Sequence, residues 1–226
     1  MDRVAIVGIG QTKIEASKER QNYPEMVYEA VRLALEDAGV GMDEVDNVVT
    51  TSNDFWDGRT ISCMPVGGVS GGYDKNISGV EGDGTFGAFY AACRTISGSY
   101  GTTLVTAHSK GSESRDIAPM ITNATFDPIH ARCLGLDTIT AGALQARKYM
   151  QRYGISEEEC ARVSVKNHGN AMGNPYAQLP KELTVEQVLA SPYIAWPVKV
   201  LDTSPTTDGA RAVIFASEDV ARSITD

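Results

Sequence analysis

The first fifty residues alternate strand and helix signals, and this alternation constrains the fold more than any other feature of the chain. Residues 3–8 form a short β-branched run that predicts a buried strand followed by a tight turn. Asn22 and Pro24 then predict a helix start, apolar residues recur at helical spacing, and Gly39 predicts the helix end. Residues 46–51 predict a second strand. A strand–helix–strand opening favours an α/β sheet.

The glycines after the first strand invite comparison with a dinucleotide-binding turn. Gly8 and Gly10 match the first two positions of G-x-G-x-x-G, but Lys13 occupies the third. The residues after Gly10 also do not open a helix, which that motif requires. The sequence therefore does not favour a dinucleotide site.

The middle of the chain continues the sheet pattern after an irregular stretch. Residues 52–84 are dominated by Gly, Ser, Asp and Asn, which is typical either of a functional or interface loop or of a covering loop whose glycines only satisfy turns. Residues 85–96 are apolar almost all round and predict a helix buried on most sides. Residues 101–108 predict the next strand.

A long excursion follows that does not fit a simple alternating sheet. It carries two predicted helices, residues 138–153 and 156–170, the second with a capping box at Ser156 and Glu159. Residues 184–187 predict another capped helix, which is short.

The chain then returns to the sheet. Residues 211–216 predict a closing buried strand, and a helical tail follows. We therefore expect a first core segment at 1–109, a covering loop subdomain at 110–198, and at 199–226 the closing strand with the start of a further half.

Composition excludes several classes of function. The net charge of −9, from 20 basic and 29 acidic residues, argues against general nucleic-acid affinity. No apolar run approaches the roughly 20 residues needed to span a bilayer, and the first residues are not typical of a signal peptide. We expect a cytoplasmic protein without membrane association.

The four cysteines do not predict a metal site or disulfides. They are widely scattered, none forms a C-x-x-C pair, and His130 near Cys133 supplies only two of the four ligands of a structural zinc. We expect reduced thiols and no bound metal.

Three blocks resemble the amino-terminal half of the thiolase superfamily, in its sterol-carrier-protein-type branch. Residues 4–12 (VAIVGIGQT) resemble the family's first strand and turn. Residues 165–178 (VKNHGNAMGNPYAQ) are close to a signature of that branch, and residues 202–210 (DTSPTTDGA) resemble the block before its fifth strand. The resemblance covers essentially the whole chain, in order. It implies an α/β/α core with a mixed five-stranded sheet plus a covering loop subdomain.

The resemblance also places the family's nucleophilic cysteine. In the family it sits at the amino end of the buried helix, where partial positive charge and free N–H groups lower the thiol pKa. The matching segment here is residues 80–87 (VEGDGTFG), and the cysteine position falls on Gly84. Glycine cannot be acylated, so covalent acyl transfer at this position is excluded.

Relatives that lack the cysteine are aldolases of steroid side-chain degradation. The resemblance therefore implies a lyase that cleaves the Cα–Cβ bond of a β-hydroxyacyl-CoA. One alternative is an acyltransferase that uses Cys93 or Cys63, although Cys93 is expected to be a packing residue in mid-helix. The other is a non-catalytic subunit that binds acyl-CoA or scaffolds a partner. We expect no cofactor other than coenzyme A carried by the substrate.

Candidate site residues fall in two regions. At the helix start, Gly82, Gly84 and Thr85 offer amides to a substrate oxygen, and Asp83 either binds substrate or caps the helix. In the excursion the candidates are His168 for catalysis or substrate binding, His130 and Tyr176 for substrate binding, and Arg132, Arg147 and Lys148 for the coenzyme A phosphates.

The resemblance also implies partners. Thiolases take a catalytic histidine and a second cysteine from their C-terminal half, which lies beyond Asp226 or on a separate chain. Members of this branch often pair with a small zinc-ribbon and OB-fold protein, and residues 54–59 place aromatics beside charges as an interface does. We expect a homodimer formed through residues 102–107.

Overall fold

A computed structural model describes residues 3–224, which form two compact units. One unit combines Met1–Ser114 with Thr207–Asp226, and the other is Arg115–Thr206. The chain thus leaves the first unit once and returns to it once. The observed divisions lie five and eight residues after the expected ones at 109/110 and 198/199.

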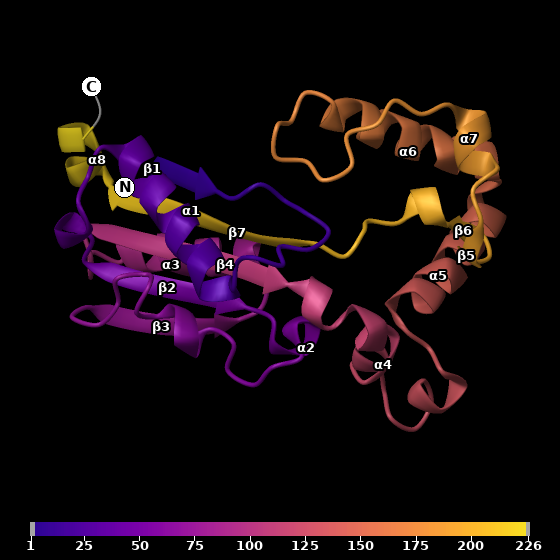
Figure 1. Ribbon diagram of the computed structural model, residues 1–226, viewed down its shortest axis with the longest axis horizontal. Helices are drawn as coiled ribbons and strands as arrows, with labels where there is room; N and C mark the ends of the chain where they lie inside the picture. Colours follow the sequence, from indigo (N-terminus) through magenta and orange to yellow (C-terminus); the bar gives the residue numbers. More distant parts are fainter. Residues whose placement is uncertain (1–2, 225–226) are drawn as a thin grey trace. The chain divides into compact units, whose positions relative to one another are not determined.

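The first unit is built on a mixed five-stranded sheet, as the resemblance implies. Its strand order is β1-β7-β4-β2-β3, with β2 parallel to β3 and β4, and β7 antiparallel to β1 and β4 (Figure 1). The strands are β1 (Val4–Gln11), β2 (Asn47–Ser52), β3 (Asn76–Glu81), β4 (Thr102–Lys110) and β7 (Asp208–Ser217), and the helices are α1 (Tyr23–Ala38), α2 (Asp54–Asp57), α3 (Gly84–Ile96) and α8 (Glu218–Ile224).

Alternating residues of the central strands build two separate cores. Val48 and Leu104, together with Ile214, pack with the apolar face of α1. Val49 and Val105 lie one residue further along β2 and β4 and pack with α3. Because successive side chains of a strand point to opposite faces, α1 and α3 cover opposite faces of the sheet.

Helix α1 forms as the sequence predicts. The Asn22 side chain accepts a hydrogen bond from the Glu25 amide, and the Glu25 side chain returns one to the Asn22 amide. Gly39 ends the helix with φ of +68°, a left-handed conformation that glycine adopts without steric cost.

The predicted tight turn after residue 8 is wrong, because β1 continues to Gln11 at the edge of the sheet. A Cβ on Gly8 would lie 2.4 Å from the Ala34 carbonyl oxygen, and one on Gly10 would lie 2.1 Å from that of Ala30. The two glycines therefore allow α1 to pack directly on the backbone of β1. They serve helix packing rather than a phosphate.

The glycine-rich stretch at 52–84 is more regular than its composition indicates. It holds α2, a short 3-10 turn at Met64–Val66, and the whole of β3. Strand β3 was missed because it lies at the edge of the sheet, where its polar residues and Gly79 remain compatible with pairing on one side only.

Helix α3 ends as predicted and begins one residue earlier, but the prediction that it is buried on most sides is wrong. Only Gly87, Ala91 and Thr95 are buried. The opposite face carries Phe86 and Phe89, which are 57% and 67% exposed. Cys93 lies on the same exposed face. The expectation that it packs in the core is therefore wrong.

The expected dimer strand does not have a free edge. Residues 102–107 belong to β4, which pairs with β2 on one side and with β7 on the other. Its backbone therefore cannot pair with a second copy. The edge strands of the sheet are β1 and β3.

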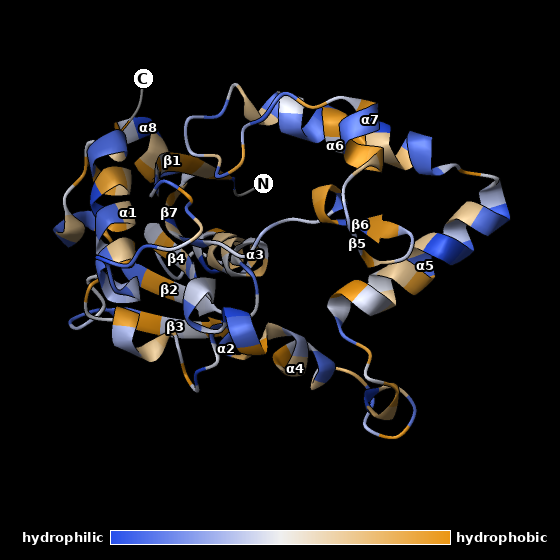
Figure 2. Cartoon of the chain, turned by 45° about the vertical axis from the view of Figure 1, so that its right-hand side comes forward, coloured by the Kyte–Doolittle hydropathy of each residue, from blue (hydrophilic) through white to orange (hydrophobic). Residues whose placement is uncertain are grey.

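The second unit is mostly helical. It contains α4 (Ala118–Asn123), α5 (Thr138–Tyr153), α6 (Glu157–Ala171), α7 (Val185–Leu189) and a small hairpin of β5 (Tyr193–Ala195) with β6 (Val198–Lys199). The predicted capping boxes at the starts of α6 and α7 are both present. Hydrophilic and hydrophobic residues alternate along α5 and α6 (Figure 2). Ala161, Leu183 and Val188 form its buried centre.

Within residues 3–224, no helix combines the length and the apolar character that crossing a membrane requires.

Candidate active site

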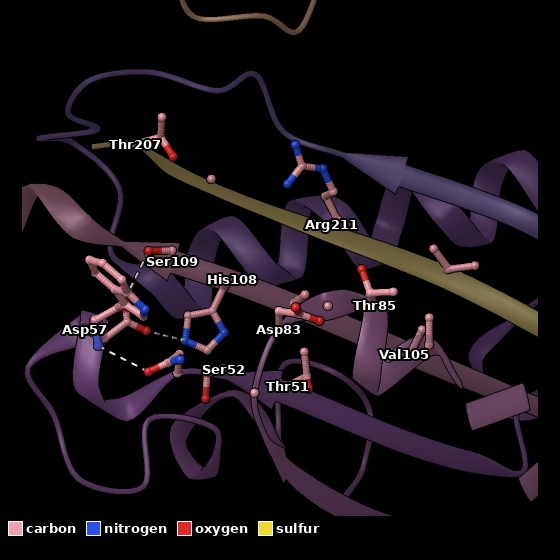
Figure 3. A pocket seen from close by; sticks show the side chains of 18 of the residues that line it. Thr51, Ser52, Asp57, Asp83, Thr85, Val105, His108, Ser109, Thr207 and Arg211 are labelled. Carbon is pink, nitrogen blue, oxygen red and sulfur yellow. Dashed lines mark hydrogen bonds and ion pairs between the residues drawn. The ribbon is translucent and has the colours of Figure 1, made fainter. Parts of the chain in front are cut away.

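A cavity of about 710 Å³ lies within the first unit. It opens where the carboxyl ends of β2 and β4 meet the amino end of α3, with β7 along another side (Figure 3). Ligands commonly bind beyond the carboxyl ends of parallel strands. Its lining includes Asp57, Gly82, Asp83, Gly84, Thr85, Ala107, His108 and Arg211.

The start of α3 forms one wall of the cavity. Asp83 is the N-cap, and its side chain accepts a hydrogen bond from the Phe86 amide at 2.9 Å. Gly82 has φ of +151°, a conformation that side chains disfavour. Gly84 and Thr85 follow as the first helical residues, whose amides have no partner within a helix. These amides form a donor site at the positive end of the helix dipole.

Gly84 is packed as well as small. A Cβ at this position would lie 3.0 Å from the Cβ of Ala107, closer than such atoms normally approach. The side chain of Ala107 therefore occupies part of the space that a larger residue at position 84 would need. Helix α3 also lies close to β2, and Gly87 permits this approach. A Cβ on Gly87 would lie 2.7 Å from the Thr51 hydroxyl.

His108 and Asp57 form a second wall, which was not predicted from the sequence. Their side chains are 0% and 1% exposed, and the imidazole Nε2 lies 3.9 Å from the Asp57 Oδ2. Neither ring nitrogen of His108 has a hydrogen-bond partner among the described residues, and neither does Oδ2 of Asp57. Burial lowers the pKa of His108 to about 4, and the nearby Arg59 guanidinium acts in the same direction. The imidazole is therefore neutral at pH 7.

Hydrogen bonds fix the other carboxylate oxygen of Asp57. Oδ1 accepts from the Lys110 amide at 3.0 Å and from the Ser109 hydroxyl at 3.2 Å. Burial nevertheless raises the pKa of Asp57, because these bonds offset only part of the desolvation.

A stack of side chains holds the His108 ring. The ring of Tyr23 stacks on it with centroids 5.1 Å apart and 14° between the planes. The Arg59 guanidinium lies 4.4 Å from the centre of the Tyr23 ring and forms an ion pair with Glu113. The position of the imidazole is thus set by α1, the loop after α2 and the segment after β4.

A buried ion pair closes the same end of the sheet. Asp208 is fully buried and binds the Lys110 ammonium at 2.9 Å, the Lys18 amide at 2.8 Å and the Ser112 hydroxyl at 2.7 Å. Burial alone would raise the pKa of Asp208, but these hydrogen bonds outweigh it and the pKa lies below its usual range. Asp208 thereby fixes the segments that leave and re-enter the first unit.

The structure brings together only part of the predicted site. Gly82, Asp83, Gly84 and Thr85 all line the cavity, and Asp83 is observed in the capping role that the sequence left open.

The remaining candidates belong to the second unit. His130 lies in an exposed turn. His168 lies on α6 and its Nδ1 is 3.1 Å from the Leu179 carbonyl oxygen. Tyr176 is 42% exposed.

Two of the three basic candidates of the second unit have structural partners. Arg132 donates to the carbonyl groups of Phe126 and Ala124, and the Arg147 guanidinium lies 5.0 Å from the Trp196 ring. Lys148 lies on α5, and its predicted role at a coenzyme A phosphate stays a prediction.

Two signals could have revealed His108 and Asp57. His108 stands near the carboxyl end of a predicted strand, and Asp57 follows the preceding strand within an acidic loop. Because carboxyl ends of parallel strands meet at one edge of a sheet, polar residues there are candidates for a site. Between residues 3 and 224, no three His, Cys, Asp or Glu side chains are arranged to hold a metal ion.

Comparisons with known proteins show which proteins the chain is similar to. No family model matches it. It is 32% identical over 247 aligned residues to an acetyl-CoA acetyltransferase of Methanothermobacter thermautotrophicus, covering 100% of this chain and 60% of that protein. It is 27% identical to sterol carrier protein 2 of Gallus gallus, covering 97% of this chain and 42% of that protein. A solved Ltp2-ChsH2(DUF35) aldolase superposes with a TM-score of 0.77 at 25% identity, covering 98% of this chain and 57% of that one.

The chain is thiolase-like. Both its sequence and its sheet match the amino-terminal part of these proteins, so the resemblance stated from residues 4–12, 165–178 and 202–210 is confirmed. The chain spans about 60% or less of the length of these three relatives.

Proposed function

We propose that this thiolase-like chain is part of an enzyme that cleaves the Cα–Cβ bond of a β-hydroxyacyl-CoA by a retro-aldol reaction. The observation that carries the proposal is Gly84, which stands at the first position of α3 in the wall of the cavity. Glycine provides no nucleophilic side chain at this position, but the start of the helix still presents free backbone amides. The site therefore retains charge stabilisation and lacks covalent catalysis.

The chemistry requires a base and hydrogen-bond donors but no nucleophile. A base removes the proton of the β-hydroxyl, the freed electron pair forms a carbonyl, and the Cα–Cβ bond breaks. The electrons of that bond pass to the thioester and form an enolate, which carries its negative charge on the thioester oxygen. The enolate later takes up a proton at Cα. The amides of Gly84 and Thr85 are placed to bind that oxygen as it gains charge.

The comparisons support this proposal without deciding between two chemistries. One similar solved structure is that of an aldolase, whereas one similar protein, from Methanothermobacter thermautotrophicus, is an acetyl-CoA acetyltransferase. Gly84 and its contact with Ala107 favour the aldolase chemistry for this chain. We expect the base to come from the part of a thiolase-like protein that has no counterpart in this chain.

An acyltransferase that uses another cysteine is the second candidate function. No cysteine is among the described residues that line the cavity. Cys63 packs against β3, since a Cβ on Gly79 would lie 2.8 Å from its sulfur, and Cys93 lies in mid-helix on the exposed face of α3. Cys93 is far from the amino end of its helix, and Cys63 precedes only the single 3-10 turn Met64–Val66, so neither lies at the amino end of an α-helix, where a thiol becomes acidic.

The proposal extends to partners. The similar solved aldolase is described with a second component, which supports a small partner subunit here as well. The exposed apolar face of α3 is suited to contact with the remainder of a thiolase-like protein, on the same or a separate chain. A homodimer remains part of the proposal, with the edge strand β3 as the available pairing strand instead of β4.

The native protein that contains this chain provides the test. It is incubated separately with a β-hydroxyacyl-CoA and with a β-ketoacyl-CoA plus free coenzyme A, and products are followed by mass spectrometry. We expect an aldehyde or ketone plus a shortened acyl-CoA from the first substrate and no thiolysis of the second. Thiolysis that stops when a single cysteine is alkylated would establish the acyltransferase instead. Binding of both thioesters without any cleavage would leave the protein a non-catalytic acyl-CoA-binding subunit.

A further inference from the structure

Arg211 is the one charged side chain on the α3 side of the five-stranded sheet, among the strand residues that the structure describes. Along β7 it precedes Val213 and Phe215, which pack with α3. Because alternate side chains of a strand point to the same face, Arg211 points to the α3 side as well. The other charged residues of these strands lie on the opposite side of the sheet, and they are Glu81, His108, Lys110 and Asp208.

Arg211 stands close to the start of α3. In the antiparallel pairing of β4 with β7, its partner is Ala107. The Cβ atoms of such partners lie about 5 Å apart. A Cβ on Gly84 would in turn lie 3.0 Å from the Cβ of Ala107. Position 84, Ala107 and Arg211 therefore form one continuous layer, and all three line the cavity.

The guanidinium of Arg211 has free donor groups. Its Nε donates to the side-chain oxygen of Gln11 at 3.4 Å, across the pairing of β1 with β7. The side chain is exposed and belongs to none of the ion pairs found within residues 3–224. In Figure 3 it extends from β7 apart from the other labelled side chains. Because Gln11 occupies Nε, the two terminal nitrogens remain, and such a pair binds both oxygens of a carboxylate.

Both acidic side chains that border the cavity are engaged elsewhere. The Asp83 carboxylate accepts from the Phe86 amide as the cap of α3. The Asp57 side chain is 1% exposed, and its Oδ1 accepts from the Lys110 amide. The amides at the start of α3 add partial positive charge to the same cavity. The charges around the cavity thus favour a negatively charged group beside Arg211.

We propose that Arg211 binds a second carboxylate, carried by the acyl chain of the substrate, and so selects carboxyacyl thioesters. The inference rests on the proposed function, because it takes a β-hydroxyacyl-CoA with its thioester oxygen at the Gly84 and Thr85 amides. Only Ala107 separates position 84 from Arg211, so the carboxylate stands a few bonds along the acyl chain. The phosphates of coenzyme A lie beyond the long pantetheine arm and fit this short separation poorly.

Calorimetry on the native protein that contains this chain tests the selectivity. The probes are 3-hydroxyglutaryl-CoA, 3-hydroxyadipyl-CoA and 3-hydroxypimelyl-CoA, each compared with the same thioester in which a carboxamide replaces the terminal carboxylate. The carboxamide keeps the length and shape of the chain and removes its charge. We expect at least one carboxylate probe to bind about tenfold more tightly than its amide, as charge-assisted hydrogen bonds do. The inference is overturned if every carboxylate probe binds no better than its amide.

Substitutions of Arg211 separate a binding role from a structural one. Arg211→Gln should lower the affinity for the preferred carboxylate probe to that for its amide. Arg211→Lys keeps the charge without the planar fork and should keep part of the preference. Arg211→Glu should bind a chain that ends in an ammonium group more tightly than the carboxylate probe, an exchange that a structural role does not produce. Arg222→Gln is the matched control and should keep the native preference, because Arg222 lies on α8 and does not line the cavity.

The outcomes distinguish this inference from the proposed function. If Arg211→Gln weakens the carboxylate probes, the amides and free coenzyme A alike, the guanidinium binds the coenzyme and the inference is wrong. If the native protein prefers the carboxylate probes but cleaves none of them, the retro-aldol function fails and the inference stands. If it cleaves carboxylate and amide probes with equal kcat/KM and binds them equally, only the inference fails. If no thioester binds, both fail.

Discussion

At Gly84 a missing side chain and a free backbone amide act at the same point. The amide belongs to the first turn of α3, where the helix dipole favours negative charge. The absent Cβ is matched by Ala107, whose own Cβ fills the neighbouring space to within 3.0 Å of where it would lie. The surroundings of position 84 thus fit glycine. Replacing Gly84 alone by cysteine would give a thiol that Ala107 crowds.

A pair of variants tests this adaptation. We expect Gly84→Cys alone to give a thiol that alkylates slowly, because its Cβ meets Ala107. Gly84→Cys combined with Ala107→Gly should free the thiol and expose it to the helix amides, which lower its pKa. A pKa lowered by about one unit corresponds to a roughly tenfold larger thiolate fraction at neutral pH. The measurement is the iodoacetamide labelling rate at each cysteine, resolved by peptide mass spectrometry.

The exposed Cys133 serves as the internal control for that experiment. If the introduced thiol in the double variant labels no faster than Cys133, the start of α3 does not stabilise negative charge. The donor site, and with it the proposed enolate stabilisation, would then be contradicted.

The site was predictable from the sequence only where it is local. Asp83 and Gly84 stand within one helix start, so capping preference and the family resemblance both locate them. His108 and Asp57 lie 51 residues apart and meet only through the order of the strands, which the sequence indicated but did not determine. Their unpartnered nitrogens and oxygen are properties of packing, which no residue pattern displays.

At the scale of elements, close approach of helices to strands explains the glycines that composition alone left ambiguous. Gly8 and Gly10 bring α1 against β1, and Gly87 brings α3 against β2. The elements with strong caps, α1, α5, α6 and α7, were predicted to within a residue or two because their signals are local. Strand β3 was missed because an edge strand carries little hydrophobic alternation.

The packing role of Gly10 predicts a large effect from one methyl group. In Gly10→Ala the new Cβ would lie 2.1 Å from the Ala30 carbonyl oxygen and 2.5 Å from the Ala34 amide, both backbone atoms that cannot rotate away. Overpacking of this kind typically costs about 1–3 kcal/mol, and we expect a free energy of unfolding lower by at least that amount. Urea denaturation followed by circular dichroism gives the value.

Gly142→Ala is the matched control, since Gly142 lies inside α5 and a Cβ there would meet no atom within 4 Å. Alanine in a helix interior is more stable than glycine by about 0.5–1 kcal/mol, so this variant should gain stability. Equal stability changes in the two variants would show that α1 does not pack on the β1 backbone as described.

At the scale of the whole molecule, the chain carries an exposed apolar face on α3. It spans at most about 60% of the length of the relatives compared above, and α3 presents Phe86, Phe89 and Ile96 to solvent on one face. The sequence predicted a helix apolar on all sides and therefore burial on most sides. That inference fails, because within the described residues only one face of α3 packs on the sheet.

The exposed face of α3 predicts how the isolated 226-residue chain behaves in solution. Phe89 is 67% exposed, and an apolar face of this kind favours association with a second surface. We expect Phe89→Ser to lower the binding of a hydrophobic dye and the self-association measured by sedimentation velocity. The free energy of unfolding should change by no more than about 0.5 kcal/mol, as is usual for a surface position.

Leu144→Ser on α5 is the control, because Leu144 is 57% exposed and lies outside this face. If both variants reduce dye binding and association equally, the effect is general surface hydrophobicity. If only Phe89→Ser does, the outer face of α3 is the surface through which this chain self-associates.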